Sequence, residues 1–282
     1  MIEIKNIDFA YKKKQNLFSE LSLTMTQGHI YGLLGKNGTG KTSLLKIISG
    51  LLFAQKGEVN VLGYNAASRK PDMLNDLYFL PEEIFVPYLK IKQIEKVYAP
   101  FYPKFSKEQF DNYLKEFEIQ DKNALVNKLS QGQKKKVMIA FALACNTKLL
   151  LLDEPTNGLD IPSKSIFRRV MASVATEDIA IIISTHQVRD LHSLIDSVII
   201  LDNGEIIINE TDEYITQKLT FNVLETPVNE TTFLYAEDNF RGLAIVKEND
   251  EHIETKLDLE LFFNAVMANK SKMKDVFNLK NE

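Results

Sequence analysis

Residues 35–42 form a glycine-rich loop whose residue types suit the binding of phosphate groups. The loop reads Gly-Lys-Asn-Gly-Thr-Gly-Lys-Thr, which matches the pattern Gly-x-x-x-x-Gly-Lys-[Ser/Thr]. Its glycines let the backbone bend around an anion, so that N–H groups point inward as donors. Lys41 would reach the β- and γ-phosphates of a nucleotide, and the Thr42 hydroxyl would be a Mg²⁺ ligand. The sequence therefore predicts that the chain binds a nucleoside triphosphate.

The segments on either side of this loop predict the elements that hold it. Residues 29–34 are a short, mainly apolar run typical of a buried strand, and residues 43–48 have the apolar spacing of a helix. A loop between such a strand and helix places the phosphates at the helix N-terminus, where the dipole and free N–H groups favour an anion. A glycine-rich turn without a ligand is the alternative, and this context argues against it.

Two adjacent carboxylates, Asp153 and Glu154, follow a run of four leucines at residues 149–152. Continuous apolar runs of this length suit central strands of a parallel sheet. A carboxylate at the C-terminal edge of such a strand can hold Mg²⁺ beside a phosphate loop. The second carboxylate could polarise an attacking water as a general base. Taken alone, the pair fits a structural turn about as well.

Three further segments accompany the two carboxylates. Residues 129–133 read Leu-Ser-Gln-Gly-Gln, residues 155–160 read Pro-Thr-Asn-Gly-Leu-Asp, and residues 184–186 read Ser-Thr-His after a second apolar run at 179–183. In this order the motifs resemble the ATP-binding subunit of an ATP-binding cassette (ABC) transporter over residues 1–215. The resemblance implies an α/β fold with a P-loop NTPase (RecA-like) core, an antiparallel β subdomain and an inserted α-helical subdomain at about 83–146. Residues 216–282 are then expected to form a small C-terminal α+β extension, because strand-like segments precede a helix-like one.

The resemblance also implies a role for each motif. Asp153 matches the Mg²⁺-binding aspartate, Glu154 the catalytic glutamate, and His186 the histidine that hydrogen-bonds the γ-phosphate. Tyr11 lies where the family keeps an aromatic residue that stacks on adenine. The residues implied to hold the phosphates and Mg²⁺ in the Walker A loop and just after it are Gly35, Lys36, Asn37, Gly38, Thr39, Gly40, Lys41, Thr42 and Ser43.

A second subunit is implied by the remaining motifs. The signature residues Ser130, Gln131 and Gly132 would approach the ATP bound on the other subunit, and Asp160 would pass between the two subunits. Gln131 stands where the family most often has Gly. Glu82 stands where the family has the glutamine of its Q-loop, and we expect it to be a Mg²⁺ ligand and a link to a membrane partner.

The expected activity is ATP hydrolysis with Mg²⁺ at a head-to-tail dimer of nucleotide-binding domains. We expect integral membrane permease subunits as partners, docked near the helical region after Glu82. The helical subdomain, the lysines at 134–136 and the C-terminal tail resemble bacterial ABC-2-type exporters of drugs, antimicrobial peptides or lipid-linked substrates. The chain would be cytoplasmic and attached peripherally to the inner face of the membrane. Whether the dimer is homomeric or heteromeric stays open.

Two alternatives belong to other functional classes. The first is a soluble ABC ATPase that acts on protein or nucleic acid, for example one of the iron–sulfur assembly type. Chromosome-maintenance members have a long coiled coil, but the segment between Thr42 and Ser130 has none of the heptads that are typical of one. A non-catalytic regulatory cassette is the other alternative, and Glu154 and His186 argue against it.

The composition of the chain bears on nucleic-acid binding, disulfides and membrane spans. The chain has 282 residues, a net charge of −4 and one cysteine, Cys145. This charge gives no reason to expect nucleic-acid binding. A single cysteine allows no intrachain disulfide, and its apolar neighbours predict a buried structural thiol. The longest apolar runs are far shorter than the roughly 20 residues of a membrane span. The lysines at 134–136 are expected on a solvated face.

Overall fold

A six-stranded sheet forms the centre of the molecule in the computed structural model, which describes residues 1–12, 15–85, 88–224 and 233–277. The strands of the described chain from β9 to β6 run parallel, and β10 pairs antiparallel with β9. In spatial order they are β10 (Glu205–Thr211), β9 (Ser197–Asp202), β3 (Ile30–Leu34), β8 (Ala180–Thr185), β7 (Leu149–Asp153) and β6 (Leu77–Leu80).

The central strands are apolar throughout because both faces of the sheet are covered. Leu150 and Leu152 of β7 belong to one hydrophobic cluster, and Leu149 and Leu151 belong to another on the opposite face. Successive side chains of a strand point to opposite faces, so a run of four leucines fills both clusters. This explains the continuous apolar run seen in the sequence.

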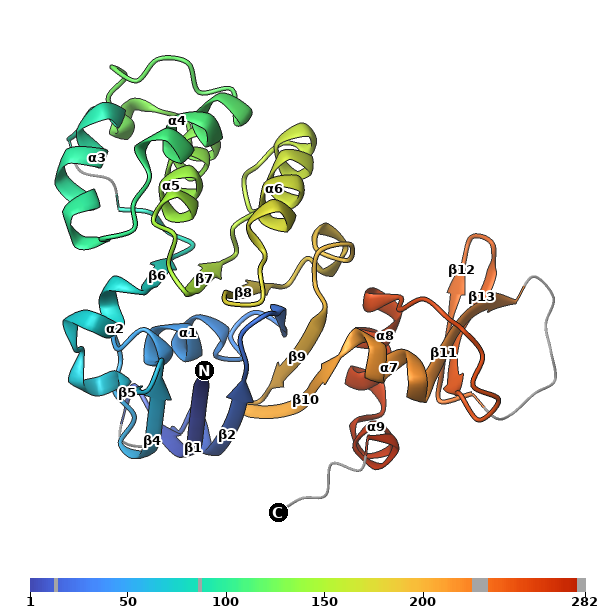
Figure 1. Ribbon diagram of the computed structural model, residues 1–282. Helices are drawn as coiled ribbons and strands as arrows, with labels where there is room; N and C mark the ends of the chain where they lie inside the picture. The colour runs from blue at the N-terminus through green and yellow to red at the C-terminus, as the bar shows by residue number, and fades with distance from the viewer. Residues whose placement is uncertain (13–14, 86–87, 225–232, 278–282) are drawn as a thin grey trace.

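An antiparallel sheet and α1 (Lys41–Ile48) cover one face of the central sheet (Figure 1). In β1, Ile2, Ile4 and Ile7 are buried in the shared cluster with apolar residues of α1. The short helix α2 (Pro71–Asn75) precedes β6. In spatial order the antiparallel strands are β2 (Phe18–Met25), β1 (Ile2–Phe9), β4 (Lys56–Val61) and β5 (Tyr64–Asn65).

A helical region lies between β6 and β7 in the chain and forms the upper left part of Figure 1. It contains α3 (Ile91–Tyr98), α4 (Lys107–Glu116) and α5 (Gln131–Ala144), and α6 (Ile161–Val174) follows β7. The Ser106 hydroxyl accepts a hydrogen bond from the Gln109 N–H and so caps α4. Cys145 is buried at the end of α5, and burial raises the pKa of its thiol.

A smaller α+β unit follows β10 and lies on the right of Figure 1. Its antiparallel sheet has the order β11 (Leu219–Leu224), β13 (Gly242–Glu248) and β12 (Tyr235–Asn239). Phe262 is fully buried between this sheet and the helices. The helices are α7 (Asp212–Lys218), α8 (Leu259–Ala268) and α9 (Lys270–Val276).

These elements confirm the predicted α/β fold with a P-loop NTPase core. The expected boundary between residues 215 and 216 falls within α7, and the division into two domains stays a prediction. Residues 86–87, 225–232 and 278–282 of the predicted subdomain and extension lie outside the described residues. Within the described part of the chain, no helix has both the length and the apolar character needed to cross a bilayer.

Candidate nucleotide-binding site

The predicted phosphate loop connects β3 to the first turn of α1. Gly40 is the N-cap residue of α1 and has a φ of 109°, which side-chain-bearing residues rarely adopt. A Cβ at Gly40 would lie 2.8 Å from the ring of Phe18. Both the backbone conformation and the close approach of this ring therefore require glycine. The loop consequently ends at a helix N-terminus, which attracts anions through its free N–H groups and its dipole.

Lys41 is buried at the base of this loop. Its ammonium donates hydrogen bonds to the carbonyl oxygens of Gly35 and Lys36, at 2.7 and 3.2 Å. Burial lowers the pKa of Lys41, while the charges of Glu154 and Asp153 oppose this effect. The Glu154 carboxylate lies 4.0 Å from the ammonium. The loop thus holds a positive charge close to a carboxylate at the place where phosphates would bind.

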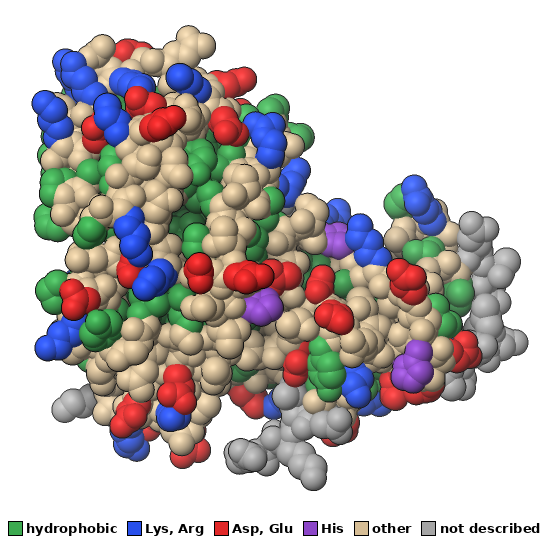
Figure 2. All heavy atoms as spheres, viewed as in Figure 1, with side chains coloured by type: hydrophobic (Ala, Val, Ile, Leu, Met, Phe, Trp, Pro, Cys, Tyr) green, Lys and Arg blue, Asp and Glu red, His purple; other side chains and the backbone are tan. Residues whose placement is uncertain are grey.

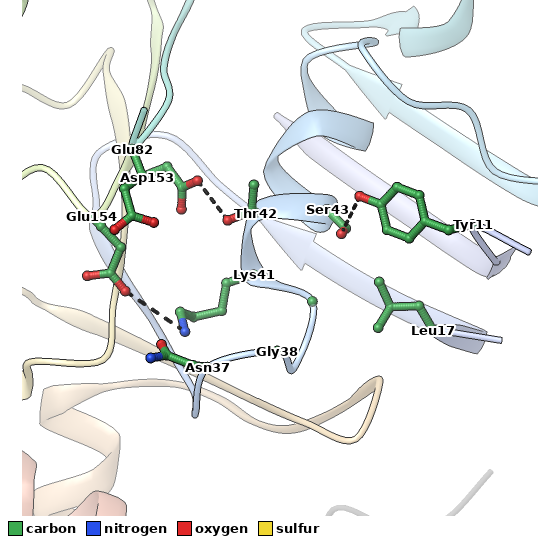
Figure 3. Close-up of a pocket in the computed structure, with 11 residues that line it drawn as sticks. Tyr11, Leu17, Asn37, Gly38, Lys41, Thr42, Ser43, Glu82, Asp153 and Glu154 are labelled. Carbon is green, nitrogen blue, oxygen red and sulfur yellow. Dashed lines mark hydrogen bonds and ion pairs between the residues drawn. The ribbon is translucent and has the colours of Figure 1, made fainter. Parts of the chain in front are cut away.

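Thr42 and Asp153 supply oxygen atoms of the kind that Mg²⁺ prefers. The Thr42 hydroxyl donates a 2.7 Å hydrogen bond to one carboxylate oxygen of Asp153, and Ser184 donates to the other oxygen. Asp153 is nearly fully buried, and its carboxylate points at the first turn of α1 (Figure 3). A buried carboxylate beside a hydroxyl and a phosphate loop fits Mg²⁺, so these two residues are the ones that would hold it.

Glu154 follows directly, and three donors orient its carboxylate. The Thr185 hydroxyl donates to one oxygen at 3.3 Å, and the N–H of His186 donates to the other at 3.0 Å. The imidazole Nδ1 of His186 lies 2.7 Å from that second oxygen. The structure therefore brings His186 to Glu154. The predicted contact of His186 with a γ-phosphate stays a prediction.

A pocket of about 470 Å³ joins these residues to the aromatic side chain predicted to stack on adenine. Figure 3 shows Glu82, Asp153 and Glu154 on one side of α1, and Tyr11 and Leu17 on the other. The Tyr11 hydroxyl lies 2.9 Å from the Ser43 hydroxyl, and 62% of Tyr11 is exposed. Stacking of this exposed ring on a nucleotide base stays a prediction. Leu17 was not predicted as a site residue.

Glu82 lines the same pocket and lies just after β6. Its carboxylate accepts a 3.0 Å hydrogen bond from the amide of Asn157, whose own oxygen accepts from Gln187 at 3.3 Å. Glu82 is exposed, unlike Asp153 and Glu154. The amide of Asn157 thus joins the Q-loop position to the segments after β7 and β8. Binding of Mg²⁺ by Glu82 stays a prediction.

The signature residues begin α5. The Ser130 hydroxyl accepts from the Gln133 N–H, and the Gln133 side chain accepts from the Ser130 N–H, which forms a capping box. Gln131 is exposed, and a Cβ at Gly132 would lie 2.8 Å from the carbonyl oxygen of Gly158. Neither Ser130 nor Gly132 is among the described residues that line the pocket around Lys41.

Asp160 caps the next helix, α6. Its carboxylate accepts a 2.9 Å hydrogen bond from the N–H of Ser163. Hydrogen bonds from Ser163 lower the pKa of the Asp160 carboxyl. The side chain is exposed, and so is the neighbouring Ile161 at 84%. Asp160 therefore lies on the surface of the subunit, apart from the Lys41 pocket.

One sequence-based expectation is wrong. The lysines at 134–136 were expected on a solvated face, but Lys135 is buried and donates a 2.8 Å hydrogen bond to the carbonyl oxygen of Glu154. The apolar residues that follow Lys135 in α5 are buried almost without interruption, so the sequence shows no helical periodicity that could have revealed its burial. Ser184, Thr185 and Asn157 hold the carboxylates in place, and none of the three is a predicted site residue.

Comparisons with known proteins show to which family the chain belongs. The family model for ABC transporters matches residues 18–157. The chain is 30% identical to the ABC transporter ATP-binding protein YtrB of Bacillus subtilis, over 81% of this chain and 79% of that protein. It is 33% identical to the bacitracin transport ATP-binding protein BcrA of Bacillus licheniformis, over 68% of this chain and 64% of that protein.

Among solved structures, an ATP-binding subunit of an ABC transporter aligns with a TM-score of 0.69 and 25% identity. The alignment covers 76% of this chain and 91% of that chain. Three findings indicate the same family: the fold shared with this solved structure, the match to the family model, and the similarity to YtrB over most of the chain. The chain belongs to the ATP-binding proteins of ABC transporters, which are ATPases that bind ATP with Mg²⁺.

Proposed function

We propose that this ATPase works as a head-to-tail dimer and drives export through separate membrane-spanning subunits. The observation that carries the proposal is that the signature residues lie away from the nucleotide pocket of their own subunit. Ser130 and Gly132 do not line the pocket that Lys41 and Glu154 share within the described chain. A second subunit turned head to tail would bring its own Ser130 and Gly132 over this pocket.

The exposed residues beside the signature support such an interface. Ser130 and Gln131 begin α5 with exposed side chains, and Asp160 and Ile161 begin α6 in the same way. An exposed isoleucine next to a carboxylate that caps a helix suits a surface covered by another subunit. The two helix beginnings would then both contribute to the interface.

The chemistry follows from the contacts of the chain's own residues. Glu154 would orient and deprotonate the attacking water, because three donors hold its carboxylate next to the phosphate loop. Lys41 would stabilise the charge that develops on the phosphates, and His186 would hold the terminal phosphate. Thr42 and Asp153 would hold Mg²⁺, which would supply further neutralisation of phosphate charge.

A membrane partner would dock on the helical region after Glu82. Phe85 is 92% exposed and Tyr88 is 81% exposed, which is unusual for two large aromatic side chains so close in the sequence. Figure 2 shows apolar side chains between charged ones over the helical part of the molecule. Such a mixed surface suits a protein partner. The chain would thereby lie on the inner face of the cell membrane.

The name of one relative supports transport as the process that ATP hydrolysis drives. BcrA is described as a bacitracin transport protein, and it shares 33% identity with this chain. We propose a related substrate class, drugs or antimicrobial peptides, with selection by the membrane subunit.

Affinity purification of the tagged chain from detergent-solubilised membranes of its native host tests the partnership. The wild-type chain should retain a polytopic membrane protein that disappears with Phe85→Ser/Tyr88→Ser, and a matched Phe240→Ser control should retain it. Phe240 is similarly exposed but lies next to β12 in the C-terminal unit. If all three chains retain only soluble proteins, and to the same extent, the result would contradict the transport role.

A further inference from the structure

Lys135 belongs to the signature helix α5, and its buried side chain reaches the end of β7. It is 5% exposed, and its ammonium donates a 2.8 Å hydrogen bond to the carbonyl oxygen of Glu154. Lysine is almost never this buried without a specific partner. Here the partner is the backbone of the residue proposed as the general base.

The backbone of Glu154 has an uncommon conformation that this contact helps to hold. Its φ is 47°, in the left-handed region that side-chain-bearing residues seldom adopt. The Glu154 N–H donates to the carbonyl oxygen of Ser184 at 3.1 Å, while the Glu154 carbonyl accepts from Lys135. A hydrogen bond to β8 therefore holds the N–H of Glu154, and a hydrogen bond from α5 holds its carbonyl group. The direction of its side chain depends on both.

The Lys135 ammonium is bonded to the backbone of Glu154, which lines one pocket together with Glu82 and Asp153. Burial lowers the pKa of Lys135, and the charges of Glu82, Glu154 and Asp153 oppose this effect, with Glu82 first among them. Glu82 occupies the position where ABC proteins are expected to have an uncharged glutamine. A lysine at this position in α5 offsets the additional negative charge, as does Lys41, which lies 4.0 Å from the Glu154 carboxylate.

We propose that Lys135 is a positioning residue that ties the signature helix to the general base of its own subunit and offsets the charge of Glu82. The inference rests on the proposed role of Glu154. A displacement of α5, when its first residues meet the nucleotide of the other subunit, then moves the backbone of Glu154. The two ATP sites of a dimer are thereby connected through one buried ammonium.

Lys135→Met tests this role because it removes the charge and the donor but keeps an unbranched apolar chain. We expect kcat for ATP hydrolysis to fall about 10- to 100-fold, as for the loss of a charge-assisted hydrogen bond. KM and the affinity for ATP should stay within about twofold, since the residue acts through Glu154 rather than on the nucleotide. Lys134→Met, on the same helix, is the matched control and should keep the wild-type kcat.

A double-mutant cycle with Glu82→Gln tests the charge relationship. The second substitution should raise kcat severalfold in the Lys135→Met background, because it removes the carboxylate that Lys135 offsets. Additive effects, or a wild-type kcat for Lys135→Met, would overturn the proposal. If Lys135→Met does not fold, Lys135→Gln decides: a reduced kcat at an unchanged KM supports the role, and a wild-type kcat overturns it.

Glu154→Gln, measured in parallel, separates the role of Glu154 as general base from the positioning role of Lys135. If this variant turns over at the wild-type rate, the general base is assigned wrongly and the positioning role fails with it. If it is inactive while Lys135→Met is as active as wild type, only the role of Lys135 fails.

Discussion

The hydroxyl of Thr42 donates a 2.7 Å hydrogen bond to the carboxylate of Asp153 and so joins the phosphate loop to the end of β7. Thr42 lies in the first turn of α1, and Asp153 is the last residue of a strand in the middle of the sheet. Ser184 holds the other oxygen of the same carboxylate from β8. The two residues proposed to hold Mg²⁺ are thus oriented by protein contacts, which is the arrangement that precise metal binding needs.

Thr42→Val should raise the Mg²⁺ concentration needed for half-maximal ATPase activity by about 10-fold or more, because it deletes one oxygen ligand and the donor to Asp153. Titration of activity with Mg²⁺ at a saturating ATP concentration measures this shift. Ser49→Ala, at the other end of α1, is the control and should leave the Mg²⁺ titration unchanged. A Thr42→Val curve that overlays the wild type would remove Thr42 from the metal site.

Glu154→Gln should reduce kcat by about 10²- to 10⁴-fold, because an amide cannot take a proton from the attacking water. The isosteric side chain should leave ATP binding intact. Size-exclusion chromatography with ATP and Mg²⁺ should then show a trapped dimer that the wild-type protein does not accumulate. Hydrolysis at the wild-type rate would falsify the assignment of Glu154 as the base.

Glu82→Ala should change the dependence of ATPase activity on Mg²⁺ if Glu82 is a metal ligand, since carboxylate oxygens contribute directly to Mg²⁺ affinity. The neighbouring exposed residue offers a matched control, Glu83→Ala, which should behave as wild type. An unchanged Mg²⁺ dependence of Glu82→Ala would exclude a metal role. The carboxylate would then serve the contact with Asn157.

Mixing two inactive variants tests the head-to-tail dimer. Lys41→Ala damages the phosphate loop, and Ser130→Asp keeps a capping side chain at α5 but brings a negative charge towards the γ-phosphate. In a head-to-tail heterodimer, one composite site would contain only wild-type residues. An equal mixture should therefore recover about a quarter of the wild-type ATPase rate, as random pairing in a symmetric dimer predicts. No recovery after exchange of subunits would argue against a shared site.

Phe262→Ala should lower the free energy of unfolding of the C-terminal unit by about 3–5 kcal/mol, because the ring is fully buried and its removal leaves a cavity. The ring contacts Phe221 and Phe277, which lie at opposite ends of this unit in the sequence. Denaturant unfolding measures the change. Phe263→Ala removes a partly exposed ring from the same helix and should cost clearly less. Equal losses of unfolding free energy in the two variants would show that Phe262 contributes no more to this core than Phe263.

Several parts of the fold follow from local chemistry that the sequence displays. The buried strands β7 and β8 appear as continuous apolar runs because both faces of a parallel sheet are covered. The caps at Ser106 and Ser130 follow from side chains that can accept from the N–H three residues on. The precise beginning of the C-terminal unit does not follow, since α7 continues across the expected boundary.

The sequence by itself determined which residues are proposed for the chemistry of this protein: a loop for phosphates, a hydroxyl and a carboxylate for Mg²⁺, and a second carboxylate for the water. These residue types and their order carry that information without a structure.

Only the tertiary structure decided how the carboxylates are held. The apolar run after Lys135 in α5 is buried on all sides, so it gives no helical phase from which the burial of Lys135 could be read. The left-handed backbone of Glu154 and the contact of Glu82 with Asn157 likewise depend on segments that are distant in the sequence. They become neighbours only when the sheet aligns the ends of its strands.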